Sequence, residues 1–377
     1  MSTFITKLTP PPNATGPRVA IKDLLDWKGT PTTAGCKAVA DSAQAATEDA
    51  ACLRHIRQLA DDNRLRIVGK TNLHELAFGA TGVNPWFGTP PNPRARHTIP
   101  GGSSSGSAAA VGNDDADVAL GSDTGGSVRI PSACCGTTGL KTTWGRVSLD
   151  GVWPLSTSLD TIGPMARDVA GVVLGMQLLE PGFAVDPITP SRIGRVRGIQ
   201  GVDPRIDEAI DDALRRAEFE VVDVELPGWQ DAEQAGVSLM FTEALAQDGG
   251  LDRQRIGDDV NAFLDMGRQF DVTDATHAAR RTQGAWQAEL AATFADHDVD
   301  LLALPTLRTF PPDVDHAADV LGAILTMAIN VAGVPALAMP VTTTDRTQPV
   351  PPSLQLVGPA NSEERLLAAG RRVEAAT

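Results

Sequence analysis

The sequence predicts an α/β fold with a mixed, largely parallel β-sheet covered by helices on both faces. Two observations support this prediction. Short apolar runs typical of buried strands alternate with longer helical stretches along all 377 residues. In addition, residues 192–226 follow the order strand, helix, strand, which is typical of a βαβ unit. No internal repeat or low-complexity tract interrupts this alternation.

In the N-terminal third, strands are expected at residues 18–24 and 65–68. Between them, apolar residues recur at three- and four-residue intervals from Val39 to Leu59, which predicts one amphipathic helix over about 37–61. A second helix is expected at 73–78, capped by Thr71 or Asn72. The proline-rich stretch 85–100 should be irregular.

The middle of the chain predicts a brief helix at 107–111, a strand at 117–120 and a turn into a strand at 136–141. An apolar helix should run from Asp168 to about 179, followed by a proline-bearing linker at 181–190. The βαβ unit comprises 192–196, 204–217 and 219–226. Helices broken at Gly249-Gly250 fill about 230–296, strands follow at 301–304, 336–339 and 354–357, and a helix closes the chain at 363–376.

Composition narrows the class of protein. The net charge of −15 argues against nucleic-acid binding through a basic surface. No stretch of about 18 apolar residues is present to span a membrane, and no signal peptide is recognisable at the N-terminus. The four cysteines have neither CxxC spacing nor the pattern of a disulfide framework. We therefore expect a cytoplasmic protein that binds neither nucleic acid nor membrane.

Two glycine-serine clusters, at 101–107 and 121–129, indicate a catalytic centre. Glycine allows positive φ and close approach of other groups, and the free N–H groups of such loops bind oxyanions. Serine supplies a nucleophile that needs a base to take its proton. Lys70 is a candidate base because it ends a predicted strand in uncharged surroundings, and burial lowers the pKa of a lysine.

Two other interpretations of these motifs are weaker. Gly69-Lys70-Thr71 is not a phosphate-binding P-loop, because position 64 is Arg instead of Gly. Gly102 to Gly106 fits the G-x-S-x-G nucleophile elbow with Ser104 as nucleophile, but the strand that should precede it is missing. A His-dependent serine esterase using Ser104 remains an alternative, and its histidine would be one of three downstream: His277, His297 and His316.

The chain resembles the amidase signature family along nearly its whole length. The blocks that carry the resemblance, in the family's order, are 68–72, 101–104, 125–131, 135–136, 139–141, 158–164, 330–335 and 355–358. The resemblance implies a triad of Lys70 as base, Ser103 on a cis peptide bond as relay and Ser127 as nucleophile. It also implies an oxyanion hole, which the backbone N–H groups of Thr124, Gly125, Gly126 and Ser127 would form.

The implied function is an amidase that acts on linear carboxamides. It would release a carboxylate plus ammonia or an amine from a Ser127 acyl-enzyme, without metal or organic cofactor. The expected partner is a small-molecule amide, and a homodimer is possible. An amidotransferase subunit of the same family is the alternative, although its arginine-rich leucine-glycine-threonine motif is not found near Arg280-Arg281. The run at 101–107 resembles indoleacetamide-hydrolase-like members, a hint toward aryl-acetamide substrates.

Further expectations concern the surroundings of the triad. Asp123 and Arg129 should form an ion pair that holds the nucleophile loop. We expect a single domain over 1–377, in which a shortened segment at about 180–300 forms part of the substrate pocket. The candidates for lining that pocket are Phe78, Trp86, Phe87, Ser104 and Trp153, with Met240 and Phe241 as further apolar candidates. Two residues have no assigned role: Ser105, and Ser353 where the family usually has glycine.

Overall fold

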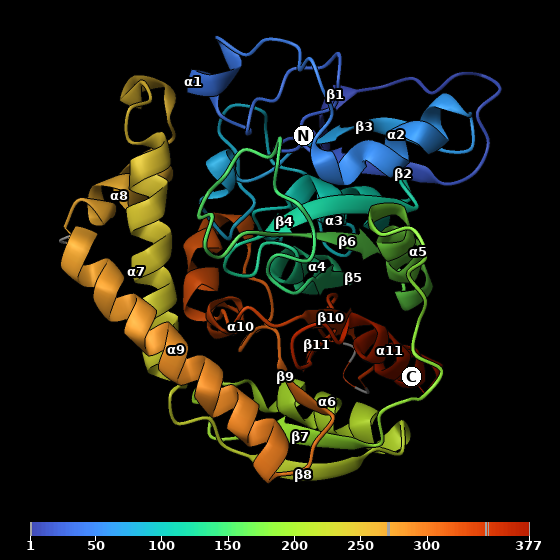
Figure 1. The fold of residues 1–377 in the computed structure, drawn as a ribbon, viewed down its shortest axis with the longest axis vertical. Coiled ribbons are helices and arrows are strands. Elements are labelled where there is room, and N and C mark those ends of the chain that lie inside the picture. The colour runs from blue at the N-terminus through green and yellow to red at the C-terminus, as the bar shows by residue number, and fades with distance from the viewer. Residues whose placement is uncertain (1, 270–271, 344, 346, 377) are drawn as a thin grey trace.

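The computed structural model describes residues 2–269, 272–343, 345 and 347–376. Through these residues runs an 11-stranded sheet with the order β1-β3-β2-β4-β6-β5-β10-β11-β9-β7-β8 (Figure 1). The strands are β1 (Phe4–Lys7), β2 (Arg18–Lys22), β3 (Arg66–Thr71), β4 (Val118–Asp123), β5 (Thr138–Lys141), β6 (Thr161–Ala166), β7 (Arg192–Val196), β8 (Glu220–Val224), β9 (Leu301–Pro305), β10 (Ala336–Pro340) and β11 (Ser353–Val357).

The α-helices are α1 (Lys37–Ala40), α2 (Arg54–Asp61), α3 (Ser105–Gly112), α4 (Arg129–Cys135), α5 (Val169–Leu179), α6 (Pro204–Arg216), α7 (Trp229–Asp248), α8 (Asp258–Gly267), α9 (Val272–Asp296), α10 (Met327–Ala332) and α11 (Glu363–Ala376). Short 3₁₀ turns lie at η1 (Ala51–Leu53), η2 (Glu75–Ala77), η3 (Arg253–Arg255) and η4 (Val314–Gly322). None of the described helices combines the length and apolarity that crossing a membrane requires.

The sheet is mixed, as the sequence predicts; among the described residues, four of its ten strand pairings are parallel and six are antiparallel. Its parallel pairings are β3–β2 and β2–β4 toward one end and β9–β7 and β7–β8 toward the other. The strands between these groups pair antiparallel, from β4–β6 through β11–β9. The predicted βαβ unit is confirmed by the parallel pairing of β7 with β8 across α6.

Helices cover both faces of the sheet because strand side chains alternate between them. In β4, Val118 and Leu120 pack in one apolar cluster with Leu178 of α5, whereas Ala119 packs with Ala110 and Val111 of α3 on the opposite face. The α5 side also carries α6 and α11. The long helices α7 and α9 run side by side along one edge of the molecule (Figure 1).

Two predicted helices are wrong, because tertiary hydrogen bonds take their backbone groups. The helix expected over 37–61 is formed only as α1, η1 and α2. Between α1 and η1, the N–H of Ala46 donates to Thr30 and that of Ala50 donates to Asp26. The helix expected at 73–78 is reduced to η2, where Leu76 has φ +54° and donates its N–H to Ala34.

Candidate active site

A buried lysine on β2 meets the serine of the first glycine-serine loop. The Nζ atom of Lys22 lies 2.8 Å from Ser103 Oγ and 2.8 Å from Ser122 Oγ. Lys22 ends β2 and Ser122 lies near the end of β4, its parallel neighbour. The side chain of Lys22 is fully buried. This desolvation lowers its pKa to about 7, although the negative charges of Asp123 and Asp160 act to raise it.

Lys70 is not placed as the resemblance implied. Its Nζ forms an ion pair with Asp23 at 2.8 Å and donates to Pro31 O at 2.9 Å and Thr32 Oγ1 at 2.7 Å. None of these partners belongs to the glycine-serine loops. The prediction that Lys70 faces Ser103 is therefore wrong.

The register of the sheet explains why the two lysines differ. In the parallel pairing of β2 with β3, Lys70 is the partner of Ile21 and Lys22 is the partner of Thr71. Partners in register share a face, and successive residues of a strand point to opposite faces. Lys22 thus shares the α3 face with Thr71, whose hydroxyl contacts Ser107, and Lys70 points the other way.

The two serine loops are joined directly. The peptide bond between Gly102 and Ser103 is cis, as the resemblance implied. The backbone N–H of Ser104 donates to Ser127 O at 3.1 Å, so the loop at 101–107 and the loop at 121–129 are in direct contact. Ser104 itself is fully buried, and its hydroxyl donates to Ser122 O at 3.2 Å. Among the described residues, the Ser104 hydroxyl is hydrogen-bonded to Ser122 O and to no histidine side chain, so the structure does not support the esterase alternative.

The predicted ion pair between Asp123 and Arg129 is confirmed. Arg129 Nη2 lies 2.9 Å from Asp123 Oδ1, and both side chains are fully buried. The guanidinium also donates to Gln355 Oε1 at 2.6 Å and to Asn330 Oδ1. Arg129 holds the pKa of Asp123 well below its usual range despite the burial of this carboxyl group. The pair anchors the nucleophile loop to α10 and β11.

Asp123 also decides which backbone groups can form the oxyanion hole. Its carboxylate accepts the N–H of Gly126 at 3.0 Å and that of Val128 at 3.1 Å. Gly126 is therefore not available as an oxyanion donor, contrary to the prediction. Within the described parts of the chain, no group accepts from the N–H of the other three predicted donors, which are Thr124, Gly125 and Ser127.

Ser127 opens onto an apolar cavity of about 380 Å³. Three packed rings form part of the wall: the centroid of Phe78 lies 5.0 Å from that of Phe241 and 5.3 Å from that of Phe263. Met240 lines the cavity as well. Other lining residues are Ala77, Gly79, Ala80, Gly125, Ile130, Leu155, Glu233, Val237, Met266, Arg308, Leu321, Ile324 and Met327.

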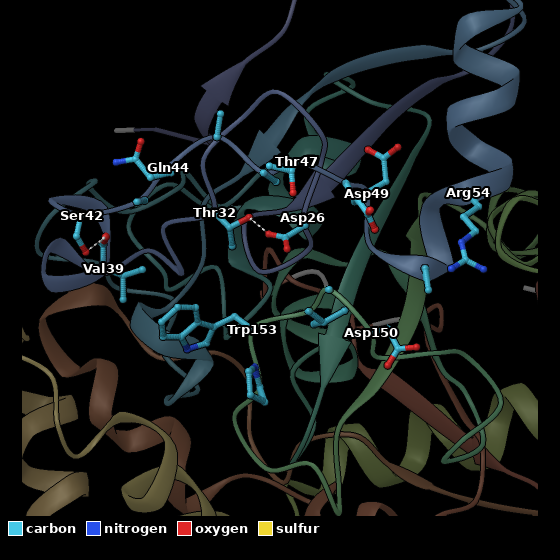
Figure 2. Close-up of a pocket in the computed structure, with 18 of the residues that line it drawn as sticks. Asp26, Thr32, Val39, Ser42, Gln44, Thr47, Asp49, Arg54, Asp150 and Trp153 are labelled. Carbon is cyan, nitrogen blue, oxygen red and sulfur yellow. Dashed lines mark hydrogen bonds between the residues drawn. The ribbon is translucent and has the colours of Figure 1, made fainter.

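The other candidates for this pocket lie elsewhere. The indole N–H of Trp86 donates to Glu75, the backbone carbonyl of Phe87 accepts from Asn72, and Ser104 is buried behind the loops. Trp153 lines a separate outer pocket beside Thr32 and Asp26, which are hydrogen-bonded to each other (Figure 2). None of these four residues lines the Ser127 cavity. Hydrogen bonds hold the side chains of Trp86, Ser104 and Trp153 elsewhere, and Trp153 donates to Asp248.

Sequence reasoning missed Lys22 and Ser122. A signal for Lys22 was present, because a lysine at the end of an apolar strand, next to Asp23, is unusual for a buried segment. Ser122 lies inside the recognised glycine-serine cluster but was given no role. The structure also accounts for Ser353, whose hydroxyl pairs with that of Thr306 at 2.9 Å between β11 and the end of β9.

The amidase family model matches residues 9–367 of this sequence. The chain belongs to the amidase family. Among similar proteins, a glutamyl-tRNA(Gln) amidotransferase subunit from Halobacterium salinarum is 33% identical, with 99% of each chain covered. The corresponding subunit from Thermus thermophilus is 34% identical, covering 95% of this chain and 84% of its own.

Solved structures agree in fold. A crystal structure of an amidase superposes with a TM-score of 0.85 at 29% identity, covering 96% of this chain and 86% of the other. A protein described in connection with the origins of an s-triazine catabolic enzyme superposes with a TM-score of 0.84 at 27% identity, covering 98% and 85%. The predicted α/β fold and family are thereby confirmed.

Proposed function

We propose that this amidase-family enzyme hydrolyses a carboxamide through an acyl-enzyme on Ser127, with Lys22 as the base and Ser103 as the relay. One observation carries the proposal: the buried Nζ of Lys22 lies 2.8 Å from Ser103 Oγ. A lysine whose pKa is about 7 is half neutral at neutral pH, the form that accepts a proton. Ser127, on the loop joined to Ser103, faces the cavity where an amide would bind.

The first step forms the bond to the substrate. Neutral Lys22 takes the proton of the Ser103 hydroxyl while Ser103 takes that of Ser127. Ser127 Oγ then bonds to the amide carbon, and the π electrons of the carbonyl move to its oxygen. The N–H groups of Thr124, Gly125 and Ser127 are proposed to stabilise this oxyanion, where losing one donor typically costs about 3 kcal/mol.

In the second half of the reaction, the proton held by Lys22 is transferred to the leaving nitrogen and the acyl-enzyme is hydrolysed. The tetrahedral carbon expels the nitrogen, which receives the proton from protonated Lys22 through Ser103 and leaves as ammonia or an amine. Water then attacks the acyl-enzyme with Lys22 again taking the proton, and the carboxylate leaves as Ser127 regains its hydrogen. The Asp123–Arg129 pair holds the nucleophile loop during both halves but exchanges no proton, because Arg129 stays charged.

Covalent labelling tests the proposed nucleophile. A fluorophosphonate probe should modify Ser127 of the wild-type protein, as mapped by mass spectrometry, and Ser127→Ala should lose both the label and ammonia release. Ser105→Ala is a matched control, since this buried serine does not line the cavity. A label on Ser104 instead would contradict the proposal and restore the esterase alternative.

The similarity to glutamyl-tRNA(Gln) amidotransferase subunits favours a second candidate, the hydrolysis of glutamine as an ammonia source for a partner. An assay for ammonia release with glutamine, hexanamide, benzamide and indoleacetamide separates the two. A free-standing amidase should hydrolyse at least one of the latter three without any partner. Turnover of glutamine, but of none of these three amides and not of the monoamide of hexanedioic acid, would favour the amidotransferase role.

A further inference from the structure

The Ser127 cavity contains two charged residues in an otherwise apolar wall. Of the described residues that line it, only Glu233 and Arg308 carry charge. The same two residues also line a larger outer groove of about 1560 Å³. They therefore stand where the cavity meets the groove. A charge kept in an apolar pocket fixes the orientation of a ligand by pairing with one of its polar groups.

Glu233 reaches this position from a helical stripe. Glu233, Val237 and Met240 are four and three residues apart on α7, so they share one face of the helix and all line the cavity. Glu233 is the polar end of an apolar row. Burial raises the pKa of its carboxyl group, which makes its negative charge the less persistent of the two.

Arg308 is fixed by the backbone but has unused donors. It follows β9, and its own N–H donates to Ala323 O at 2.7 Å. Its Nη1 donates to Gly322 O at 2.9 Å, whereas Nη2 is 3.9 Å from the nearest carboxylate oxygen of Glu233. The Nε atom is buried without an acceptor in the described structure. A guanidinium carries five N–H donors and always keeps its charge, so this one is poorly satisfied.

Building on the function proposed above, we propose that Arg308 binds a carboxylate at the far end of the substrate. The preferred substrates are then small carboxamides with an apolar body and a carboxylate opposite the amide, and the product is a dicarboxylate. The cavity of about 380 Å³ is near the lower end for ligand pockets, which suits a short linear molecule. Glu225 and Asp319 line the outer groove only, and the other arginine of the groove, Arg197, is paired with two aspartates of its own. Arg308 is therefore the partner left for an anion at the cavity mouth.

A matched pair of substrates tests this inference. Hexanamide and the monoamide of hexanedioic acid share chain length and differ by the terminal carboxylate. For wild-type enzyme, kcat/KM from ammonia release should favour the monoamide. Arg308→Gln should lower kcat/KM for the monoamide about 10- to 100-fold and leave hexanamide nearly unchanged. Arg308→Lys, which keeps a charge, should retain part of the preference.

Arg197→Gln is the control variant, because Arg197 lines the outer groove but not the cavity. It should leave both substrates unchanged, and thermal melting should show that all variants are folded. Equal losses for the two amides in Arg308→Gln, or no wild-type preference, would overturn the inference.

A binding measurement covers the case in which neither amide turns over. Hexanedioate should protect Ser127 from the fluorophosphonate better than hexanoate does, and this advantage should vanish in Arg308→Gln. Equal protection by the two acids would also overturn the inference. Failure to label Ser127 at all would instead contradict the proposed function, so the two failures are distinguishable.

Discussion

Replacing Lys22 by methionine tests the assignment of the base. Methionine keeps the length of the side chain and removes the proton acceptor, so the buried position stays filled. At about pH 7 an ordinary lysine of pKa 10.5 is roughly 0.03% neutral, whereas a pKa of about 7 makes about half of it neutral. The fold thus raises the reactive fraction about a thousandfold, and we expect Lys22→Met to lower kcat/KM by about that factor, within the range known for general bases.

The assay is ammonia release across a pH series. Protonated Lys22 cannot accept a proton, so wild-type activity should rise through about pH 7 and level off above it. Lys70→Arg is the matched control, since it keeps a cation beside Asp23, and it should stay within about tenfold of wild type. The reasoning is refuted if folded Lys22→Met retains a tenth of the activity, or if Lys70→Arg loses as much as Lys22→Met.

Other predictions concern the loop and the buried acids. Gly126→Ala should abolish activity, because φ is +132° and a Cβ at this position would clash with the hydroxyl of Thr326. A Cβ at Gly125 would be close only to the flexible end of Met327, so Gly125→Ala should fold normally, which thermal melting checks. Asp123→Ala should lower the free energy of unfolding in urea by about 3–5 kcal/mol by leaving Arg129 buried and unpaired. The pKa of Asp123 is depressed in the folded state. The difference in the free energy of unfolding between wild type and Asp123→Ala should therefore be largest above about pH 4 and become smaller below it. Burial raises the pKa of Asp248 to about 7, so its ionisation destabilises the folded state increasingly as pH rises from about 4 to 7. At about pH 8, Asp248→Asn should therefore have a higher free energy of unfolding in urea than wild type. This difference in stability should become smaller by about pH 5.

The sequence predicted correctly those helices and strands in which the spacing of apolar residues agrees with the positions that are buried in the structure. The strand and helix at 192–217, the apolar helix after Asp168 and the closing helix are formed nearly as expected. The patterns failed at residues 37–61, where alanine-rich periodicity fits a helix but the neighbouring loop takes the backbone hydrogen bonds. Such competition comes from residues distant in sequence, so local propensity does not report it.

The loops that form the site could be predicted from the sequence, but the lysine that faces them could not. Both serine loops and the Asp123–Arg129 pair follow from residue types and order. The choice between Lys22 and Lys70 did not, because it depends on the register of β2 against β3, where a shift of one residue exchanges the two faces. The occupation of the Gly126 N–H by Asp123 likewise depends on the geometry of the folded loop.

Half of the residues in the wall of the cavity come from a different part of the chain than the reacting groups. Lys22, Ser103 and Ser127 lie within the first 130 residues, whereas Glu233 to Met266 and Leu321 to Met327 supply nine of the 18 lining residues. Recombination or directed evolution confined to residues 229–267 should therefore change which molecule is accepted while the reactive centre stays intact. Mutant libraries limited to α7 and α8 should therefore be sufficient to change the substrate specificity of this enzyme.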